Sequence, residues 1–167
     1  MRRYMVAGNW KLNMGPVAGR ELAAGVAELL EGRDLRGDVV VCPPFLTIPA
    51  VAPVAHGDPV QLGAQNCATH AKGAFTGEVS AAMLAEAGVR HVIIGHSERR
   101  EYYGEQDDDF VRKIEQVFAA GLKAIFCYGE VLDQRKSGRA EAVVDAQLRG
   151  VLPRLDGANA YNLVLAY

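Results

Sequence analysis

The chain has 167 residues, of which 50% are apolar and 23% are charged, and this length and composition are typical of one globular domain. Eighteen Lys and Arg residues against twenty Asp and Glu residues leave a formal net charge of −2, so no basic excess points to nucleic acid as a partner. The three cysteines form no CxxC pair, which argues against a disulfide framework and a structural zinc site. They are Cys42, Cys67 and Cys127.

The compartment is predicted from the apolar runs. None approaches the ~20 residues needed to cross a bilayer. The apolar stretch after Met1, Arg2 and Arg3 is too short for the core of a signal peptide. Free thiols fit a reducing compartment. We therefore expect a cytoplasmic protein with no membrane partner.

Six short apolar runs recur along the chain, and most of them are continuous rather than alternating. Continuous runs rich in Val, Ile and Leu are typical of strands buried on both faces of a parallel sheet. The predicted strands are 4–7, 39–42, 60–64, 91–94, 124–127 and 163–166.

Helical patterns lie between these runs. The first helix is expected to begin at Pro16 and to end at Gly32, since proline suits the first helical position and glycine the residue after the last turn. Its predicted apolar stripe consists of Leu22, Val26, Leu29 and Leu30.

Three further helices are predicted. Ser80 is expected to cap a short helix with Met83 and Leu84 on its inner face. A longer helix follows the fourth strand, with aspartates at 107–109 in its first turn and Gly121 after its last. The last spacer shows helical spacing over 144–152, whereas prolines at 49 and 53 limit the second spacer to a short or broken helix.

Alternating strands and helices predict an α/β fold with right-handed crossovers. Two architectures fit: an open doubly wound sheet and a (β/α)8 barrel. No two glycines stand at positions i and i+2, so the dinucleotide motif GxGxxG is missing, and so is GxxxxGK[ST]. A barrel takes ~200–250 residues, whereas 167 residues supply five βα units and a sixth strand. On the residues alone, both an open sheet and an incomplete barrel stay possible.

Ligands bind at the carboxyl ends of the strands in both architectures. His96 follows the fourth strand where a helix can begin, and the positive potential there is expected to disfavour an imidazolium ion. Lys11 follows the first strand. An ammonium and a neutral imidazole that meet at one rim could stabilise an enediolate oxygen. Each residue also has an ordinary interpretation: a structural histidine, a surface lysine, and a surface ion pair between Glu98 and Arg99.

The segment 66–79 is unusually long for a loop between a strand and a helix, where two to six residues are common. It contains an aromatic residue and two glycines within 73–78. This composition favours an active-site lid or an interface loop over an ordinary insertion.

Four motifs, at 7–13, 73–78, 94–100 and 127–130, closely resemble the triosephosphate isomerase family in order and spacing, and 163–167 is similar to that family's sixth strand. The resemblance covers the whole chain. It implies a TIM barrel that interconverts dihydroxyacetone phosphate and glyceraldehyde 3-phosphate, a step of glycolysis and gluconeogenesis, without a metal or organic cofactor.

The resemblance also implies roles for single residues. Asn9 and Lys11 would bind the triose phosphate, and Lys11 would supply positive charge. His96 would polarise the carbonyl group and move a proton between the two oxygens. Ser97 and Glu98 would support these groups.

The same resemblance implies a homodimer. Thr76 would lie at the tip of a loop that docks into a partner subunit, with Phe75 and Glu78 beside it in the interface.

The given sequence departs from the family pattern at its last residue, Tyr167. In the family the catalytic glutamate comes directly after the tyrosine that matches Tyr167, and the given sequence does not include that position. We therefore expect residues 1–167 to form a single incomplete barrel domain that is inactive alone, because a missing base typically lowers the rate ~10²–10⁴-fold. Two alternatives stay open. The chain could be a non-catalytic association or complementation module, or a different barrel enzyme such as an aldolase that forms a Schiff base on Lys11, which borohydride would trap.

Overall fold

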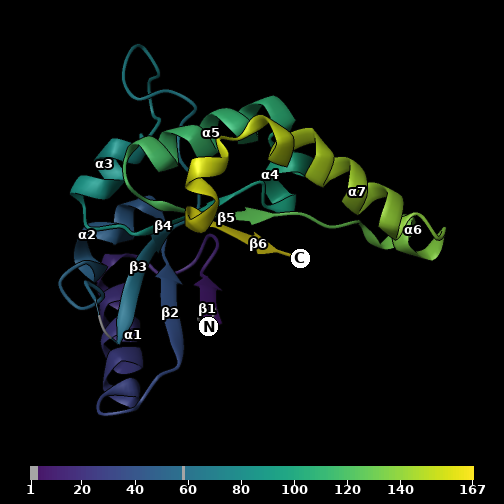
Figure 1. Cartoon of the computed structure of the whole chain (residues 1–167). Helices are drawn as coiled ribbons and strands as arrows, with labels where there is room; N and C mark the ends of the chain where they lie inside the picture. The colour runs from purple at the N-terminus through teal and green to yellow at the C-terminus, as the bar shows by residue number, and fades with distance from the viewer. Residues whose placement is uncertain (1–3, 58) are drawn as a thin grey trace.

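The computed structural model describes residues 4–57 and 59–167, so the first three residues, used above in the signal-peptide argument, lie outside the described part. Its centre is a six-stranded parallel sheet (Figure 1). The strands are β1 (Tyr4–Asn9), β2 (Gly37–Cys42), β3 (Val60–Ala64), β4 (His91–Ile94), β5 (Lys123–Cys127) and β6 (Leu163–Ala166).

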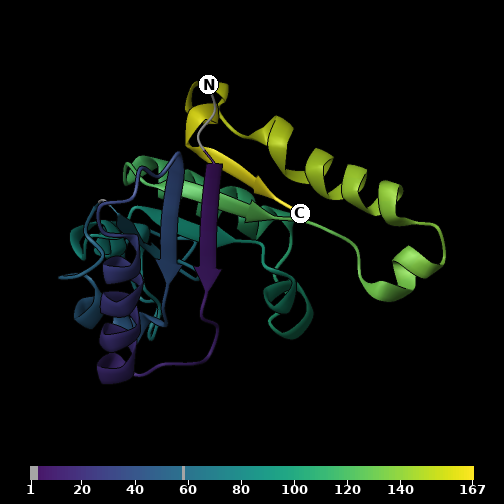
Figure 2. The same cartoon turned by 90° about the horizontal axis from the view of Figure 1, so that it is seen from below.

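The strand order decides between the two predicted architectures. The strands pair in the sequential order β1-β2-β3-β4-β5-β6, and each pair is parallel. A doubly wound sheet would reverse direction at a switch point, whereas a barrel adds each strand on the same side. Within the described residues β1 and β6 each pair on one side only, and the sheet curls between them (Figure 2). The fold is therefore a partial TIM barrel, the architecture that the family resemblance implies and one of the two that the residues alone left possible.

Helices connect the strands. They are α1 (Pro16–Leu30), α2 (Ile48–Val51), α3 (Ala81–Glu86), α4 (Ser97–Tyr102), α5 (Asp107–Ala119), α6 (Leu132–Lys136) and α7 (Ala140–Val151), with 3-10 turns η1 (Phe45–Thr47), η2 (Leu152–Arg154) and η3 (Gly157–Asn162).

Local signals mark several of the helix ends. Pro16 begins α1, and Gly32 follows it with a φ of 70°. The Ser80 side chain accepts a hydrogen bond from the backbone N–H of Met83 at 3.3 Å, as expected of a cap. Gly121 follows α5 with a φ of 72°.

The central strands β3, β4 and β5 are largely buried on both faces, which explains why they read as continuous apolar runs, whereas the edge strands β1 and β6 are partly exposed. Side chains on the outer face pack against the helices, whereas alternate side chains fill the inside of the curled sheet. The outer layer includes Leu62, Val92, Ile94, Phe110, Ile114 and Phe126. The inner layer is formed by Val40, Cys42, Ile93 and Ile125.

Two predicted apolar faces are partly wrong. Leu22 and Leu29 are exposed, because α1 meets its neighbours through Gly19 and Ala23, its buried residues. A Cβ on Gly19 would come 2.4 Å from a methyl carbon of Thr47, so the helix lies too close for a large side chain at that point. Met83 is likewise exposed, and α3 buries Leu84 but not Met83.

Candidate active site

His96 stands at the carboxyl end of β4, directly before α4. Its Nδ1 accepts a hydrogen bond from the backbone N–H of Glu98 at 3.3 Å. Since a backbone N–H only donates, Nδ1 carries a lone pair and the proton of the neutral ring belongs on Nε2. The start of α4 therefore sets the tautomer, and Nε2–H is the donor that the ring can offer to a ligand.

Lys11 and His96 meet at one carboxylate, although they follow different strands. Lys11 Nζ donates to Glu98 Oε1 at 2.8 Å, and Glu98 Oε2 lies 3.4 Å from His96 Nδ1. Because Nδ1 and Oε2 both accept hydrogen bonds, the second contact is one of proximity and not a hydrogen bond. The hydrogen bond from Lys11 lowers the pKa of the Glu98 carboxyl. The ordinary interpretation of Glu98 and Arg99 as an ion pair with each other is wrong, because Glu98 pairs with Lys11 while Arg99 pairs with Glu105.

The backbone of Lys11 is held in an uncommon conformation, with a φ of 55°. Its N–H donates to Asn9 Oδ1 at 2.9 Å. Gln65, which follows β3, donates from Nε2 to the carbonyl oxygens of Lys11 and Cys42, both at 2.9 Å. Gln65 directly follows the predicted strand 60–64, but the sequence did not reveal this role, since an amide bonded to distant carbonyl groups leaves no spacing signal.

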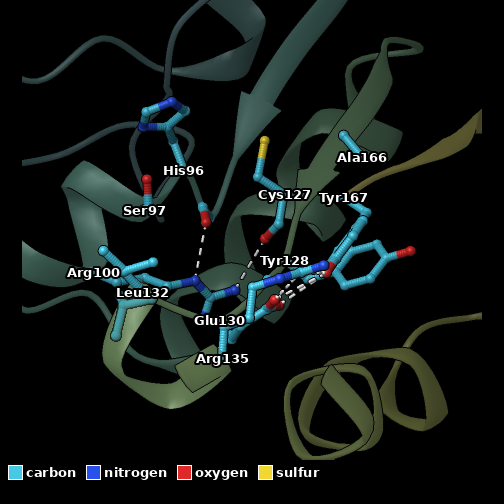
Figure 3. Close-up of a pocket in the computed structure, with 13 residues that line it drawn as sticks. His96, Ser97, Arg100, Cys127, Tyr128, Glu130, Leu132, Arg135, Ala166 and Tyr167 are labelled. Atoms are coloured by element: carbon cyan, nitrogen blue, oxygen red, sulfur yellow. Dashed lines mark hydrogen bonds and ion pairs between the residues drawn. The ribbon is translucent and has the colours of Figure 1, made fainter. Parts of the chain in front are cut away.

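Two cavities open at this rim and share His96. The smaller, about 290 Å³, is lined by Asn9, Lys11, Gln65 and Glu98 as well as His96. The larger, about 590 Å³, lies at the ends of β4, β5 and β6 (Figure 3). Ser97, Arg100, Cys127, Glu130, Arg135 and Tyr167 are among the residues that line it.

A charged cluster forms one wall of the larger cavity (Figure 3). The Tyr167 hydroxyl donates to Glu130 Oε1 at 3.0 Å, and Arg135 Nη1 donates to the same oxygen at 2.6 Å. The backbone of the preceding residue, Gly129, is clasped by the side-chain amide of Gln147 on α7, at 2.8 Å and 3.1 Å. Tyr167 and Glu130 are thus held together at the end of β6.

The long loop between β3 and α3 carries the residues expected at a subunit interface. It projects away from the sheet (teal in Figure 1), and Thr76, Phe75 and Glu78 are exposed on it. Phe75 stacks on the His70 ring, with ring centroids 4.0 Å apart. Their role at an interface stays a prediction.

Neither a metal cluster nor a membrane span is found in the described part of the chain. Its His, Cys, Asp and Glu side chains form no group of three that could hold a metal ion. Among the same residues, no helix is long and apolar enough to cross a membrane.

Sequential parallel strands with polar side chains at their carboxyl ends define the class of (β/α)8-barrel proteins. The family model for triosephosphate isomerase matches residues 4–167. The chain belongs to the triosephosphate isomerase family.

Individual relatives agree with this assignment. The triosephosphate isomerase of Herpetosiphon aurantiacus is 48% identical over 168 residues, and that of Rhodopirellula baltica 46% over 166 residues. These alignments cover 100% and 99% of this chain but 66% and 65% of the relatives, so the chain spans just under two thirds of their length. The crystal structure of triosephosphate isomerase from Bartonella henselae superposes with a TM-score of 0.88 at 40% identity, covering 99% of this chain and 68% of that one.

Proposed function

We propose that the whole protein interconverts dihydroxyacetone phosphate and glyceraldehyde 3-phosphate through an enediolate, and that His96 and Lys11 stabilise its oxygens. The base that takes the proton from carbon is proposed to be the glutamate that follows the residue matching Tyr167 in the family. The observation that carries the proposal is the arrangement of the two groups around Glu98, with the Nε2–H of His96 left as a donor. A donor that is fixed before the reaction stabilises charge as it develops on an oxygen.

Each residue then has a distinct task. His96 polarises the substrate carbonyl from Nε2 and transfers a proton between the two oxygens. Lys11 supplies the positive charge, and Asn9 holds the Lys11 backbone in place through its Oδ1. Ser97 and Glu98 belong to the supporting groups, and Glu98 holds the Lys11 ammonium near His96.

The aldolase alternative is less well supported. A lysine that forms a Schiff base is usually activated by desolvation or by a neighbouring cation. The Lys11 side chain is instead half exposed and paired with a carboxylate. Borohydride reduction in the presence of dihydroxyacetone phosphate would reveal an adduct on Lys11, and we expect none.

The proposal extends to assembly and compartment. The exposed loop carrying Phe75, Thr76 and Glu78 is proposed to form a homodimer interface in the whole protein. We propose the cytoplasm as its compartment, since its three cysteines are free thiols. A polypeptide of residues 1–167 alone is proposed to lack useful turnover and to act by associating with a complementing chain through the edges of β1 and β6.

Nuclear magnetic resonance tests the substrate proposal directly. We would titrate dihydroxyacetone phosphate into protein labelled at its histidines and follow the ring resonances of His96. They should shift on binding, whereas those of exposed His56 should not. Lys11→Met should weaken the apparent affinity, and Lys72→Met, which removes an exposed lysine of the loop, is the matched control. An unmoved His96 would count against the proposal.

A polypeptide of residues 1–167 can also be assayed for isomerase activity, with and without a peptide that supplies the carboxyl-terminal third of a relative. Recovery of activity on addition of the peptide would support complementation. Turnover at a rate typical of the family without the peptide would contradict the proposed inactivity.

A further inference from the structure

Arg100 links the carboxyl ends of β4 and β5, next to His96, through two hydrogen bonds. Its Nε donates to the carbonyl oxygen of Gly95 at 3.0 Å, and its Nη2 donates to the carbonyl oxygen of Cys127 at 3.1 Å (Figure 3). The planar guanidinium group presents its donors in a fixed fork. Arg100 therefore fixes the end of β4 relative to the end of β5.

The guanidinium group is itself held from two sides. It lies over the ring of Phe110, 4.1 Å from the centroid, and Nη1 is 3.6 Å from Asp107 Oδ1. Asp107 in turn fits against Gly150 of α7, where a Cβ would come 2.1 Å from Asp107 Oδ2. The position of Arg100 thus depends on the first residue of α5 and on the close approach of α7.

Gly95 connects the position of Arg100 to the position of His96. Gly95 has a φ of 74°, and a Cβ at this position would come 2.9 Å from the Phe126 ring and 3.1 Å from Arg100 Nη2. The carbonyl oxygen that Arg100 binds belongs to the peptide group that also contains the nitrogen of His96. Because a peptide group is planar, a donor that fixes this oxygen also fixes the direction in which His96 leaves the strand.

We propose that Arg100 is a positioning residue for His96: by holding the Gly95 carbonyl against the end of β5, it keeps the imidazole where Nδ1 meets the Glu98 amide and Nε2–H is available to a ligand. The inference rests on the proposed function for the catalytic meaning of His96. The spatial part, from Arg100 to the tautomer of His96, can be tested without substrate.

The ring nitrogens of His96 report this effect in protein labelled with 15N-histidine. In the wild type we expect the Nε2–H tautomer to dominate. Arg100→Met should lower the ratio of Nε2–H to Nδ1–H about fivefold, the effect of one lost hydrogen bond. Arg100→Lys keeps the charge and can reach one carbonyl group, so it should restore part of the ratio.

Two controls separate positioning from a loss of stability. Arg112→Met removes an exposed arginine of α5, and Val117→Ala destabilises the core of the same helix. Both should leave the tautomer ratio of His96 unchanged. An unchanged ratio in folded Arg100→Met, or in Arg100→Lys if the methionine variant does not fold, would overturn the inference, and so would an equal change in Val117→Ala. If the ring resonances of His96 in the wild type do not shift on addition of dihydroxyacetone phosphate, the proposed function fails, whereas the inference about Arg100 and the tautomer still stands.

Discussion

His91, the first residue of β4, makes the stability of this protein sensitive to acid. Its side chain is fully buried, and neither ring nitrogen has a hydrogen-bond partner among the described residues. Its pKa is lowered from 6.5 to about 4, and burial is the largest cause. Lys123, its partner on β5, and Arg90 contribute to this lowering, while Asp38 opposes it. The ring is therefore neutral in the folded protein at pH 7.

Linkage between protonation and folding gives the sign and the size of the effect. Between pH 6.5 and about pH 4 the unfolded chain binds a proton at His91 and the folded chain does not, so the free energy of unfolding rises with pH in this window. The contribution is complete above pH 6.5 and is lost as the pH falls to about 4. A shift of this size corresponds to ~3 kcal/mol, a large fraction of the ~5–15 kcal/mol of a typical domain.

Urea unfolding followed by the fluorescence of Trp10, the single tryptophan, measures this contribution. We would compare wild type, His91→Phe and His56→Phe at about pH 7 and about pH 4.5. The carboxyl groups titrate equally in all three proteins and cancel in the comparison. His91→Phe should lose less stability on acidification than wild type, and His56→Phe, which changes an exposed histidine, should match wild type. Equal acid sensitivity in wild type and His91→Phe would refute the reasoning.

Further predictions concern packing, the clasp at the end of β5 and the Glu98 carboxylate. Gly63→Ala would place a Cβ 2.5 Å from the buried Cys42 sulfur and should lower the free energy of unfolding, measured with urea, by ~1–3 kcal/mol. Gly25→Ala lies in open space within α1 and should raise the same free energy by ~1 kcal/mol or less. Gln147→Leu should speed hydrogen exchange at the Gly129 amide at least about tenfold, and Gln147→Glu, which can still accept from that amide, should speed it less. Since a lysine lowers the pKa of Glu98, their pair stabilises the fold above the usual carboxyl pKa and is lost in acid. Glu98→Gln should therefore destabilise the protein at neutral pH by no more than ~1 kcal/mol, as a half-exposed pair allows, and unfolding that is equally sensitive to acid with and without Glu98 would contradict this account.

Local signals in the sequence predict the elements well, because each depends on neighbours in the chain. Continuous apolar runs predict β3, β4 and β6 with the bounds that the structure shows. Side-chain capping at Ser80 and the glycine after α5 mark helix ends through hydrogen bonds and dihedral angles a few residues away. The motif at 94–100 likewise places His96 at a helix start, where the structure finds it.

Contacts between distant segments required the tertiary structure. Three side chains donate to backbone carbonyl groups 18 or more residues away in the sequence, and the sequence does not show which strand or loop supplies the acceptor. They are Gln65, Arg100 and Gln147. A backbone carbonyl group looks the same at every residue, so no residue type in the sequence marks it as the acceptor.

The sequence by itself determined that this chain alternates buried strands with helices and that its polar residues follow the strands. Only the tertiary structure decided that the strands pair in sequential order, that α1 packs through Gly19 and Ala23 rather than through its leucines, and that Glu98 rather than another acid meets Lys11. The physical reason is range: apolar periodicity and helix caps act over one or two turns of chain. Strand order and side-chain partners depend on which surfaces meet after the chain has folded.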